Sequence, residues 1–581
     1  MPSNAFFAAA LAALALLGLS ACGGSSSDTP PTSRATAFGT VEGNDDSATS
    51  GTYSWKGVPF AKAPVGALRW KAPADPDAWT TPLSTKQFGN ACVQYGRIYG
   101  PGSNNKFDAT IGTTLNQAVG SEDCLYLNIW RPAGVEVNLP VIVFIHGGSN
   151  VSGYTADPIY DGATLAKTAN AVVVTANYRL GIFGFLDVPQ LKSGTSASED
   201  SGNFAILDNI KALQFINRNV ANFGGNAANV TVMGQSAGAI DVYALLTSPL
   251  MVSASPALFH RVMPISGGLS LSTDLPAGSI PTLNPAAVAL AQGNALLYNL
   301  VIADGNATDN ASAQAYVATQ TSAQIATYLR AKDPSTLLTT LLTKLALLGL
   351  SGSGPIPDGT VLPIDPVAAI NAGNYVKVPV LASNARDEAK LFPTFLALAP
   401  ALGGKSGRLV SDATLFSTQF SYNPDAAPTI TIDQWIPASF LPVTTPVTGF
   451  NAETDLLNRI FFIASRDNIL NALKSQQPGV WYYQFNWDKE PAPWNDIYGA
   501  AHVFDLPFVF GNFGPSLFGN VISSTANKPG RLDLSDAMMK SVAAFARTGD
   551  PNNAALGVAW PAWPQTLIFD ASLTAKTISV Q

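Results

Sequence analysis

The sequence predicts an α/β fold, in which a mostly parallel central sheet is flanked by helices. Short continuous apolar runs, typical of strands buried on both faces, recur at residues 139–145, 171–177, 230–233, 378–382 and 480–485. Helix-like stretches lie between or after them, at residues 202–220, 237–246 and 534–547. Strands that alternate with helices in this way are typical of a parallel sheet wrapped by helices.

Length and composition agree with a large globular domain. The 581 residues suffice for one large α/β domain or several small ones, and we find no linker within residues 37–581 long enough to separate domains. Hydrophobic residues make up 47% of the chain and charged residues only 12%, which indicates a large apolar interior. The net charge of −7 argues against a nucleic-acid partner, because nucleic-acid binding needs a basic patch.

The N-terminal segment resembles a bacterial lipoprotein signal. Residues 1–21 are expected to be a signal peptide, because an apolar stretch ends in Leu-Ser-Ala just before Cys22, although no Lys or Arg precedes Arg34. Residues 22–36 are expected to be a lipidated Cys22 and a flexible polar tether. We therefore expect an exported lipoprotein that faces the periplasm or cell exterior and contacts the membrane only through its lipid anchor. The alternative is a plain secretory signal and a secreted protein.

The remaining cysteines form an even pair. The chain has three cysteines, and acylation of Cys22 would leave Cys92 and Cys124. An even pair in an exported chain predicts a disulfide bond between them. The alternative is two buried free thiols.

Residues 281–350 differ from the rest of the chain. They are rich in Ala, Leu and Thr, carry few charges and have helical periodicity. We interpret them as inserted helices that form a cap over the carboxyl edge of the sheet, where open α/β sheets place their sites. Ordinary packing helices would fit the pattern equally well.

A Gly-Gln-Ser-Ala-Gly pentapeptide at residues 234–238 lies between a predicted strand and a predicted helix. A serine on such a tight turn is the nucleophile elbow of the α/β-hydrolase fold, and bulky residues two places either side of Ser236 would clash there. The start of the following helix also points backbone N–H groups toward any oxyanion formed at the serine.

Ser236 needs a base and an acid. Of the three histidines, His146 ends an apolar strand at the expected place of an oxyanion loop, and His260 reads as structural. His502 follows Ser236 at a distance that leaves room for an intervening strand and acid, the chain order of this fold. Either Asp387 or Glu388, just after the strand at 378–382, could orient the imidazole, and spacing does not choose between them.

Four further motifs resemble those of the type-B carboxylesterase family, which includes para-nitrobenzyl esterases, animal carboxylesterases and cholinesterases. They are YSWKGVPFA at 53–61, EDCLYLN at 122–128, NFGGN at 222–226, and GDPN at 549–552 followed by Trp560-Pro561. Together with the elbow they run from about Phe38 to Pro564, nearly the whole expected mature chain.

The resemblance implies an α/β-hydrolase fold with helical cap insertions and a serine carboxylic-ester hydrolase that works through an acyl-enzyme. It implies Ser236 as nucleophile, Glu388 rather than Asp387 as acid, and His502 as base. The remaining implied residues are an oxyanion hole at the N–H groups of Gly148, Ser149 and Ala237, with Gly147 shaping the loop, a disulfide between Cys92 and Cys124, and Ser266 behind the acid. The substrate would be a small-molecule ester, and no metal or cofactor is implied. The abundance of Phe, Leu and Trp indicates an apolar pocket and hence a largely apolar substrate.

Some residues depart from the family pattern. Ser149 and Asn150 replace the usual small residue and a frequent aromatic, and we expect both to change the wall of the acyl pocket. Gln235 replaces a frequent Glu before the nucleophile, and Ala389 replaces a Gly after the acid. No Trp lies between Cys92 and Cys124, so a cation–π site for quaternary ammonium groups is not expected. The alternatives are another acyl transfer on the same fold (amide, lactone or thioester cleavage, or transacylation) or a non-catalytic binding protein.

Overall fold

The computed structural model describes residues 31–392 and 410–581. The predicted signal peptide, Cys22 and most of the predicted tether therefore lie outside the described residues. The tether was expected to extend to residue 36, but Ser33–Thr36 forms strand β1, paired antiparallel with β2 (Gly39–Glu42). The folded part of the chain thus begins inside the range that we assigned to the tether.

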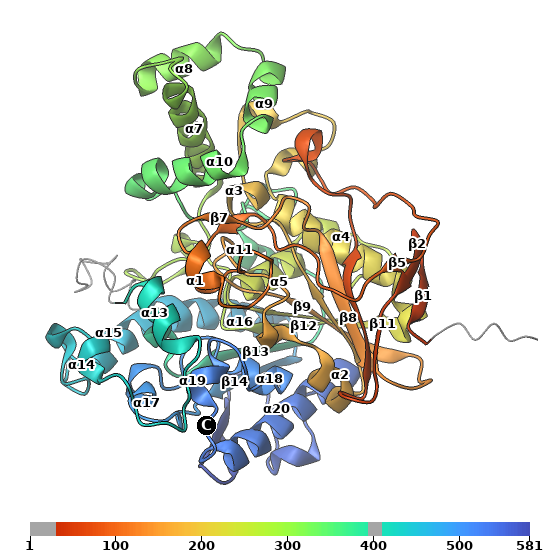
Figure 1. Ribbon diagram of the computed structural model, residues 1–581, viewed down its shortest axis with the longest axis vertical. Coiled ribbons are helices and arrows are strands. Elements are labelled where there is room, and N and C mark those ends of the chain that lie inside the picture. The colour runs from red at the N-terminus through yellow and green to blue at the C-terminus, as the bar shows by residue number, and fades with distance from the viewer. Residues whose placement is uncertain (1–30, 393–409) are drawn as a thin grey trace, which may run out of the picture.

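A twisted sheet runs through the molecule (Figure 1). Among the described residues it has eleven strands, in the order β16 (Lys576–Val580), β15 (Leu567–Ala571), β14 (Val480–Phe485), β13 (Val380–Ala385), β12 (Arg261–Ile265), β11 (Gly225–Gln235), β9 (Leu139–Ile145), β10 (Val172–Ala176), β8 (Tyr126–Pro132), β4 (Thr52–Pro59) and β3 (Asn44–Asp46). The strands from β15 to β10 pair in parallel, and the strands outside them pair antiparallel. The predicted mostly parallel sheet is confirmed.

Both faces of the sheet are buried, which explains the continuous apolar runs. Alternate residues of β9 enter different hydrophobic clusters, Val141 and Val143 on one face, Ile142 and Phe144 on the other. This is the two-residue period of a strand with no polar face. The first cluster is covered by α4 (Phe204–Asn219), α5 (Ala237–Thr247), α11 (Pro366–Asn371) and α16 (Ala464–Gln476), and the second by α2 (Ala163–Ala169), α18 (Leu506–Phe510) and α20 (Lys528–Thr548).

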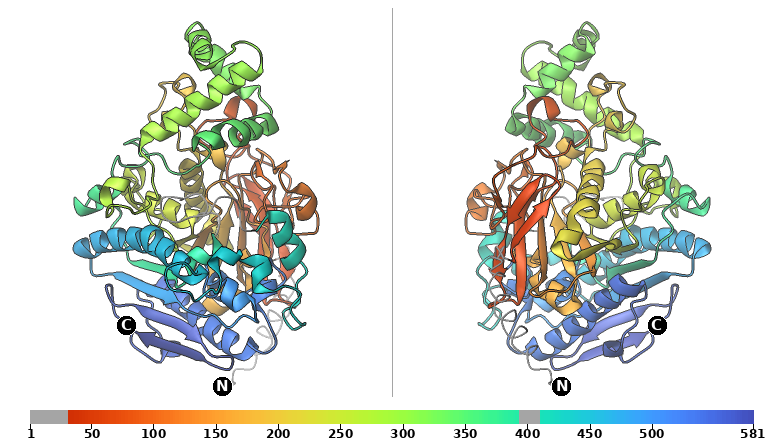
Figure 2. Two further views of the ribbon diagram at one scale, coloured as in Figure 1. Left: turned by 90° about the vertical axis from the view of Figure 1, so that its left-hand side faces the viewer. Right: turned by 90° about the vertical axis from the view of Figure 1, so that its right-hand side faces the viewer.

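The region expected to be a cap forms a helical arm instead. It contains α7 (Ala286–Ala303), α8 (Asn310–Ala318), α9 (Ser322–Arg330), α10 (Pro334–Thr340), η7 (Leu341–Leu345) and η8 (Ala346–Leu348). Figures 1 and 2 show the arm projecting from one end of the molecule, away from the sheet. Its apolar residues form a cluster of their own with Trp70 and Phe183. By length and apolar composition alone, α7 would suffice to cross a membrane, and a third of it is buried against the protein.

A second group of helices lies beside the carboxyl edge of the sheet (Figure 1). It comprises α13 (Asp412–Gln419), α14 (Ile432–Trp435), α15 (Phe450–Leu457) and the π-helical turn η12 (Asn458–Ile463). The other short elements are β5 (Leu83–Ser84), β6 (Gln94–Tyr95), β7 (Ala118–Val119), α1 (Ile111–Thr114), α3 (Gly181–Gly184), α6 (Pro249–Val252), α17 (Trp494–Ile497), α19 (Gly519–Ile522), η9 (Glu388–Leu391) and further single 3₁₀ turns.

Candidate active site

Ser236 occupies the sharp turn between β11 and α5. Its φ of 59° and ψ of −123° lie outside the region that ordinary residues favour, so the turn stores strain. A Cβ at Gly234 would lie 2.3 Å from the carbonyl oxygen of Gly238, and a Cβ at Gly238 would lie 2.2 Å from that of Ile145. Both glycines are therefore required by the close approach of backbone, as the sequence predicts.

His502 lies against Glu388 at the carboxyl edge of the sheet. Glu388 follows β13 and is fully buried, and its Oε2 lies 2.5 Å from Nδ1 of His502. Its other oxygen accepts hydrogen bonds from the Ala385 backbone at 2.8 Å and from the Asn384 amide at 3.0 Å. A carboxylate bound in this way accepts the Nδ1–H of a neutral imidazole and leaves Nε2 as the acceptor.

Asp387, the other candidate acid, is used elsewhere. Its Oδ2 accepts hydrogen bonds from Arg386 at 2.7 Å and from the backbone N–H of Ala500 at 3.0 Å. Of the two neighbouring acids that spacing could not separate, the geometry pairs Glu388 with the imidazole.

The second nitrogen of His502 faces Gln235. The Gln235 amide nitrogen lies 3.0 Å from Nε2, so the amide donates a hydrogen bond to this nitrogen. Within the described residues no hydrogen bond joins Nε2 to the Ser236 hydroxyl, although both side chains line the same cavity. The aromatic rings of Phe392 and Phe462 lie 4.9 and 5.3 Å from the imidazole and shield it from water.

The loop that follows β9 passes directly beside the elbow. A Cβ on Gly147 would lie 2.7 Å from the Gln235 carbonyl oxygen and 2.9 Å from the Ser236 Cβ, so only glycine permits this approach. Within the described part of the chain, the backbone N–H groups of Gly148, Ser149 and Ala237 donate no hydrogen bond. These are the three donors that the family resemblance assigns to an oxyanion hole.

Ser149 and Asn150 point in different directions. Ser149 lines the cavity, as expected. Asn150 is only 1% exposed and its amide bonds to Asp241 inside the protein, so the expectation that it forms part of the acyl wall is wrong. The reason is that both residues have a φ of 57°, a left-handed turn that sends the second side chain into the core.

A cavity of about 570 Å³ opens in front of Ser236 and His502. Its wall is mostly apolar and includes Leu391, Phe392, Trp435, Ile436, Phe450 and Phe518. Among the described residues that line it, none comes from the helical arm, so residues 281–350 do not cap this site. The covering side chains come from the second group of helices, where Asp412 forms an ion pair with Arg97 across the wall.

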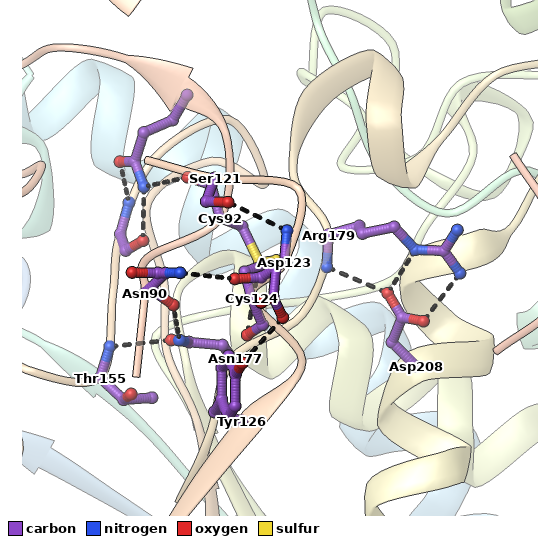
Figure 3. Close-up of a disulfide and its surroundings, with 12 residues drawn as sticks. Asn90, Cys92, Ser121, Asp123, Cys124, Tyr126, Thr155, Asn177, Arg179 and Asp208 are labelled. Carbon is purple, nitrogen blue, oxygen red and sulfur yellow. Dashed lines mark hydrogen bonds and ion pairs between the residues drawn. A yellow bond between two sulfur atoms is a disulfide. The ribbon is translucent and has the colours of Figure 1, made fainter. Parts of the chain in front are cut away.

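The loop that carries Arg97 is fastened by the predicted disulfide (Figure 3). Cys92 and Cys124 are bonded and buried. Around them, the Asn177 amide donates to the Asn90 carbonyl at 2.9 Å, and the Asn90 amide donates to that of Asp123 at 3.0 Å. The loop between the cysteines supplies Arg97 and Tyr99 to the cavity wall, so this network helps to place part of the site.

The other predicted residues have structural environments. Burial lowers the pKa of His146 to about 4, and its Nδ1 lies 2.8 Å from the Gly147 carbonyl oxygen. His260 accepts a hydrogen bond from the Val230 backbone at 3.2 Å, consistent with its structural reading. The Ser266 hydroxyl is buried and has no hydrogen-bond partner among the described residues, so the expected support of the acid is not found.

One buried acid close to the site was not predicted from the sequence. Asp505, three residues after His502, is fully buried and accepts a hydrogen bond from the Tyr483 hydroxyl at 3.0 Å. Burial, reinforced by the nearby charge of Glu388, raises the pKa of Asp505 to about 7. A loop carboxylate is usually exposed, so the local sequence gives no signal of this burial.

Comparison with known proteins covers nearly the whole chain. The family model described as the carboxylesterase family matches residues 30–576. The chain is 30% identical over 546 residues to the para-nitrobenzyl esterase of Bacillus subtilis. This alignment covers 93% of this chain and 95% of that protein. It is 31% identical to the fumonisin B1 esterase of Sphingopyxis macrogoltabida, over 90% of this chain and 83% of that protein.

Solved structures agree with these sequence matches. A para-nitrobenzyl esterase structure superposes with a TM-score of 0.68 at 26% identity and covers 95% of this chain and 97% of that chain. A carboxylesterase from Geobacillus stearothermophilus superposes with a TM-score of 0.67 at 27% identity, over 95% of this chain and 98% of that chain.

Proposed function

The chain belongs to the carboxylesterase family and is a serine carboxylic-ester hydrolase, and from this premise we propose that Ser236, Glu388 and His502 are its catalytic triad. The observation that carries the proposal is the contact between Glu388 and Nδ1 of His502 beside a cavity that Ser236 also lines. Of the alternatives weighed from the sequence, ester hydrolysis is the activity that the names of the relatives carry.

In the proposed reaction, the Ser236 hydroxyl attacks the ester carbonyl while Nε2 of His502 takes its proton. Before this step, the Ser236 hydroxyl must form a hydrogen bond to Nε2, either in place of the Gln235 amide or together with it. The imidazolium, stabilised by Glu388, next protonates the leaving alcohol. Water hydrolyses the acyl-enzyme by the same route in reverse, with His502 as base.

We assign the oxyanion hole to the backbone N–H groups of Gly148, Ser149 and Ala237, with Gly147 shaping the loop. Two of these donors come from the loop after β9 and the third from the first turn of α5. Donors held in place before the reaction stabilise the tetrahedral oxyanion without reorganisation, and loss of one typically costs about 10²–10³ in rate.

The decisive experiment uses Ser236→Ala with an activated ester such as a para-nitrophenyl ester. The variant should release no burst of alcohol and should not be labelled by a fluorophosphonate, while wild-type protein does both. Its far-UV circular dichroism provides the control for folding. A burst that persists in Ser236→Ala would overturn the assignment of the nucleophile.

For the substrate we propose a small, largely apolar ester. The proposal is supported by the apolar side chains of Trp435, Phe450 and Phe518 in the cavity wall. Esters that vary separately in acyl and alcohol size test it. The ratio kcat/KM should rise with apolar size until the cavity is filled, and a preference for charged esters would contradict the proposal.

We further propose that the protein is exported and anchored by an acylated Cys22. The support is the sequence alone: an apolar segment, a small-residue site before the cysteine and a polar tether after it. Labelling with radioactive palmitate and membrane fractionation of wild type and Cys22→Ser test the proposal. Wild type should carry label in the membrane fraction, and equal labelling of the variant would refute lipidation at this residue.

A further inference from the structure

Asn150 ties the loop after β9 to two other parts of the core. Its amide nitrogen lies 3.2 Å from Oδ1 of Asp241, and its side-chain oxygen accepts a hydrogen bond from the Tyr178 hydroxyl at 3.0 Å. The same hydroxyl lies 2.8 Å from the carbonyl oxygen of His146 at the start of the loop. The Asn150 carbonyl accepts the Gly181 N–H at 2.6 Å. Asn150 is buried and does not line the cavity, so all of these hydrogen bonds lie inside the protein.

This loop needs such an anchor because its backbone is strained. Gly148, Ser149 and Asn150 have φ values of 111°, 57° and 57°, and a left-handed conformation persists only where the surroundings impose it. Its own backbone supplies two short turns, from Val151 and Ser152 to the Gly148 carbonyl. The Asn150 side chain therefore adds to the backbone contacts that connect the loop to the rest of the protein.

Asp241 connects that loop to the nucleophile helix. It lies on α5, whose N-terminal cap is Ser236 and whose first residue is Ala237. A hydrogen bond from Asn150 to Asp241 therefore joins the element that carries the N–H groups of Gly148 and Ser149 to the element that carries the third. The two halves of the proposed oxyanion hole are held together through this pair.

Asp241 is a buried acid whose neighbours are polar but uncharged. It is fully buried, and among the described residues the groups that act on it are the amides of Asn150 and Asn209 and the phenol of Tyr178, with no cation. Burial raises the pKa of Asp241 to about 7. The Asn209 amide nitrogen lies 3.5 Å from Oδ2 of Asp241, a long contact, while its own oxygen has no partner in the described part of the chain.

We propose that Asn150 and Asp241 are positioning residues that hold the two halves of the oxyanion hole in register. Asp241 accepts from Asn150 through Oδ1 and, over a longer contact, from Asn209 through Oδ2. The inference rests on the proposed function, because it concerns the oxyanion hole of that reaction. The inference also gives a role to Asn150, which replaces a frequent aromatic residue of the family and does not form part of the acyl wall.

The test compares Asn150→Gly, Asp241→Ala and Asp241→Asn. Glycine tolerates the left-handed backbone at this position, so Asn150→Gly removes the anchor without adding strain. The measurements are kcat, KM and the affinity for a trifluoromethyl ketone, which forms a tetrahedral oxyanion adduct with the nucleophile. Asn150→Gly and Asp241→Ala should lower kcat by about 10–100-fold, weaken the ketone by a similar factor and change KM by less than about threefold.

Asp241→Asn provides the rescue, because its side-chain oxygen can still accept the hydrogen bond from Asn150. It should recover most of the kcat that Asp241→Ala loses. Thr247→Val, which alters a buried hydroxyl at the far end of α5, is the matched control and should resemble wild type. If Asn150→Gly fails to fold, Tyr178→Phe removes one contact of the same anchor and should lower kcat and ketone affinity by several-fold.

The outcomes separate this inference from the proposed function. Absence of fluorophosphonate labelling in folded wild-type protein would overturn the proposed function itself. Labelled wild-type protein together with an Asn150→Gly or Tyr178→Phe variant of unchanged kcat and ketone affinity would overturn the positioning role alone. An Asp241→Asn variant as impaired as Asp241→Ala would overturn the role of the hydrogen bond between Asn150 and Asp241.

Discussion

Gln235 brings a neutral amide to the nitrogen of His502 that we assign as the base. A neutral donor favours the unprotonated nitrogen, whereas a carboxylate in its place would accept an N–H from the imidazolium and favour the protonated ring. The other ionisable groups around the imidazole are Glu388, which contacts Nδ1, and the buried Asp505. A charge introduced at residue 235 is therefore expected to change the pH dependence of the reaction.

Gln235→Glu should move the acid limb of the kcat/KM profile to higher pH by about one unit, since an added charge within hydrogen-bond distance typically shifts a titration by this amount or more. The measurement is the pH dependence of kcat/KM with a neutral ester. Gln235→Met keeps the size and removes the amide without adding a charge, so its limb should move by less than that of Gln235→Glu. Superimposable profiles for wild type and Gln235→Glu would contradict this account.

For single residues, the sequence could identify candidate catalytic side chains but not the direction in which a side chain points. Ser236 was found because a strand, a helix and two glycines define an elbow, and His502 because the chain has only three histidines. The inward turn of Asn150 and the unpartnered hydroxyl of Ser266 depend on backbone angles and on neighbours from distant segments. No local pattern encodes these contacts.

Among the elements, the loop closed by the disulfide is expected to contribute to stability and also forms part of the cavity wall. Its cysteines are 32 residues apart, so the bond restricts a long loop in the unfolded chain. Replacing both cysteines by alanine should lower the free energy of unfolding by about 3–4 kcal/mol on the loop-entropy model. Urea unfolding measures this loss, and the KM for the ester should rise as well, because Arg97 and Tyr99 of the loop line the cavity.

Treatment of wild type with a reductant after partial unfolding should reproduce the stability of the double variant, and the same treatment should leave the variant itself unchanged. Equal unfolding midpoints for oxidised wild type and the double variant would show that the bond contributes nothing to stability.

Elements buried on both faces were the easiest to predict. The runs at 139–145 and 480–485 became β9 and β14 with the same bounds, because a strand with no polar face needs an unbroken apolar run. The helices of residues 281–350 were also predicted, but their place was not. Helical periodicity shows which face is apolar, and it does not show whether that face packs over the sheet or, as here, around Trp70 and Phe183.

Over the whole molecule, the site depends on the parallel arrangement of the sheet. Because β9, β11 and β13 run in parallel, the loops that follow them meet at one edge and bring together residues 147–149, Ser236 and Glu388. The apolar layers beneath this edge also bury several acids. Asp505 is one of them, and its fully buried position links the pH of the medium to the stability of the entire fold.

Burial raises the pKa of Asp505 to about 7, above the value of about 3.9 expected in an unfolded chain. Between these values the folded protein binds more protons than the unfolded one, so the free energy of unfolding falls as pH rises from about 4 to about 7 and is then constant. The slope is at most about 1.4 kcal/mol for each pH unit. The lowered pKa of His146 acts in the opposite sense, since its contribution is lost as pH falls from about 6.5 to about 4.

Asp505→Asn isolates the acid from this opposing histidine, because His146 is present in both proteins and cancels in their difference. The variant should gain stability relative to wild type as pH rises from 4 to 8, by no more than about 4 kcal/mol in total. Urea unfolding at a series of pH values gives the difference curve. Asp496→Asn, at an exposed aspartate, should give a flat curve. A flat curve for Asp505→Asn as well would mean that Asp505 ionises as readily in the folded protein as in the unfolded chain, and that the interior below the site tolerates a charge.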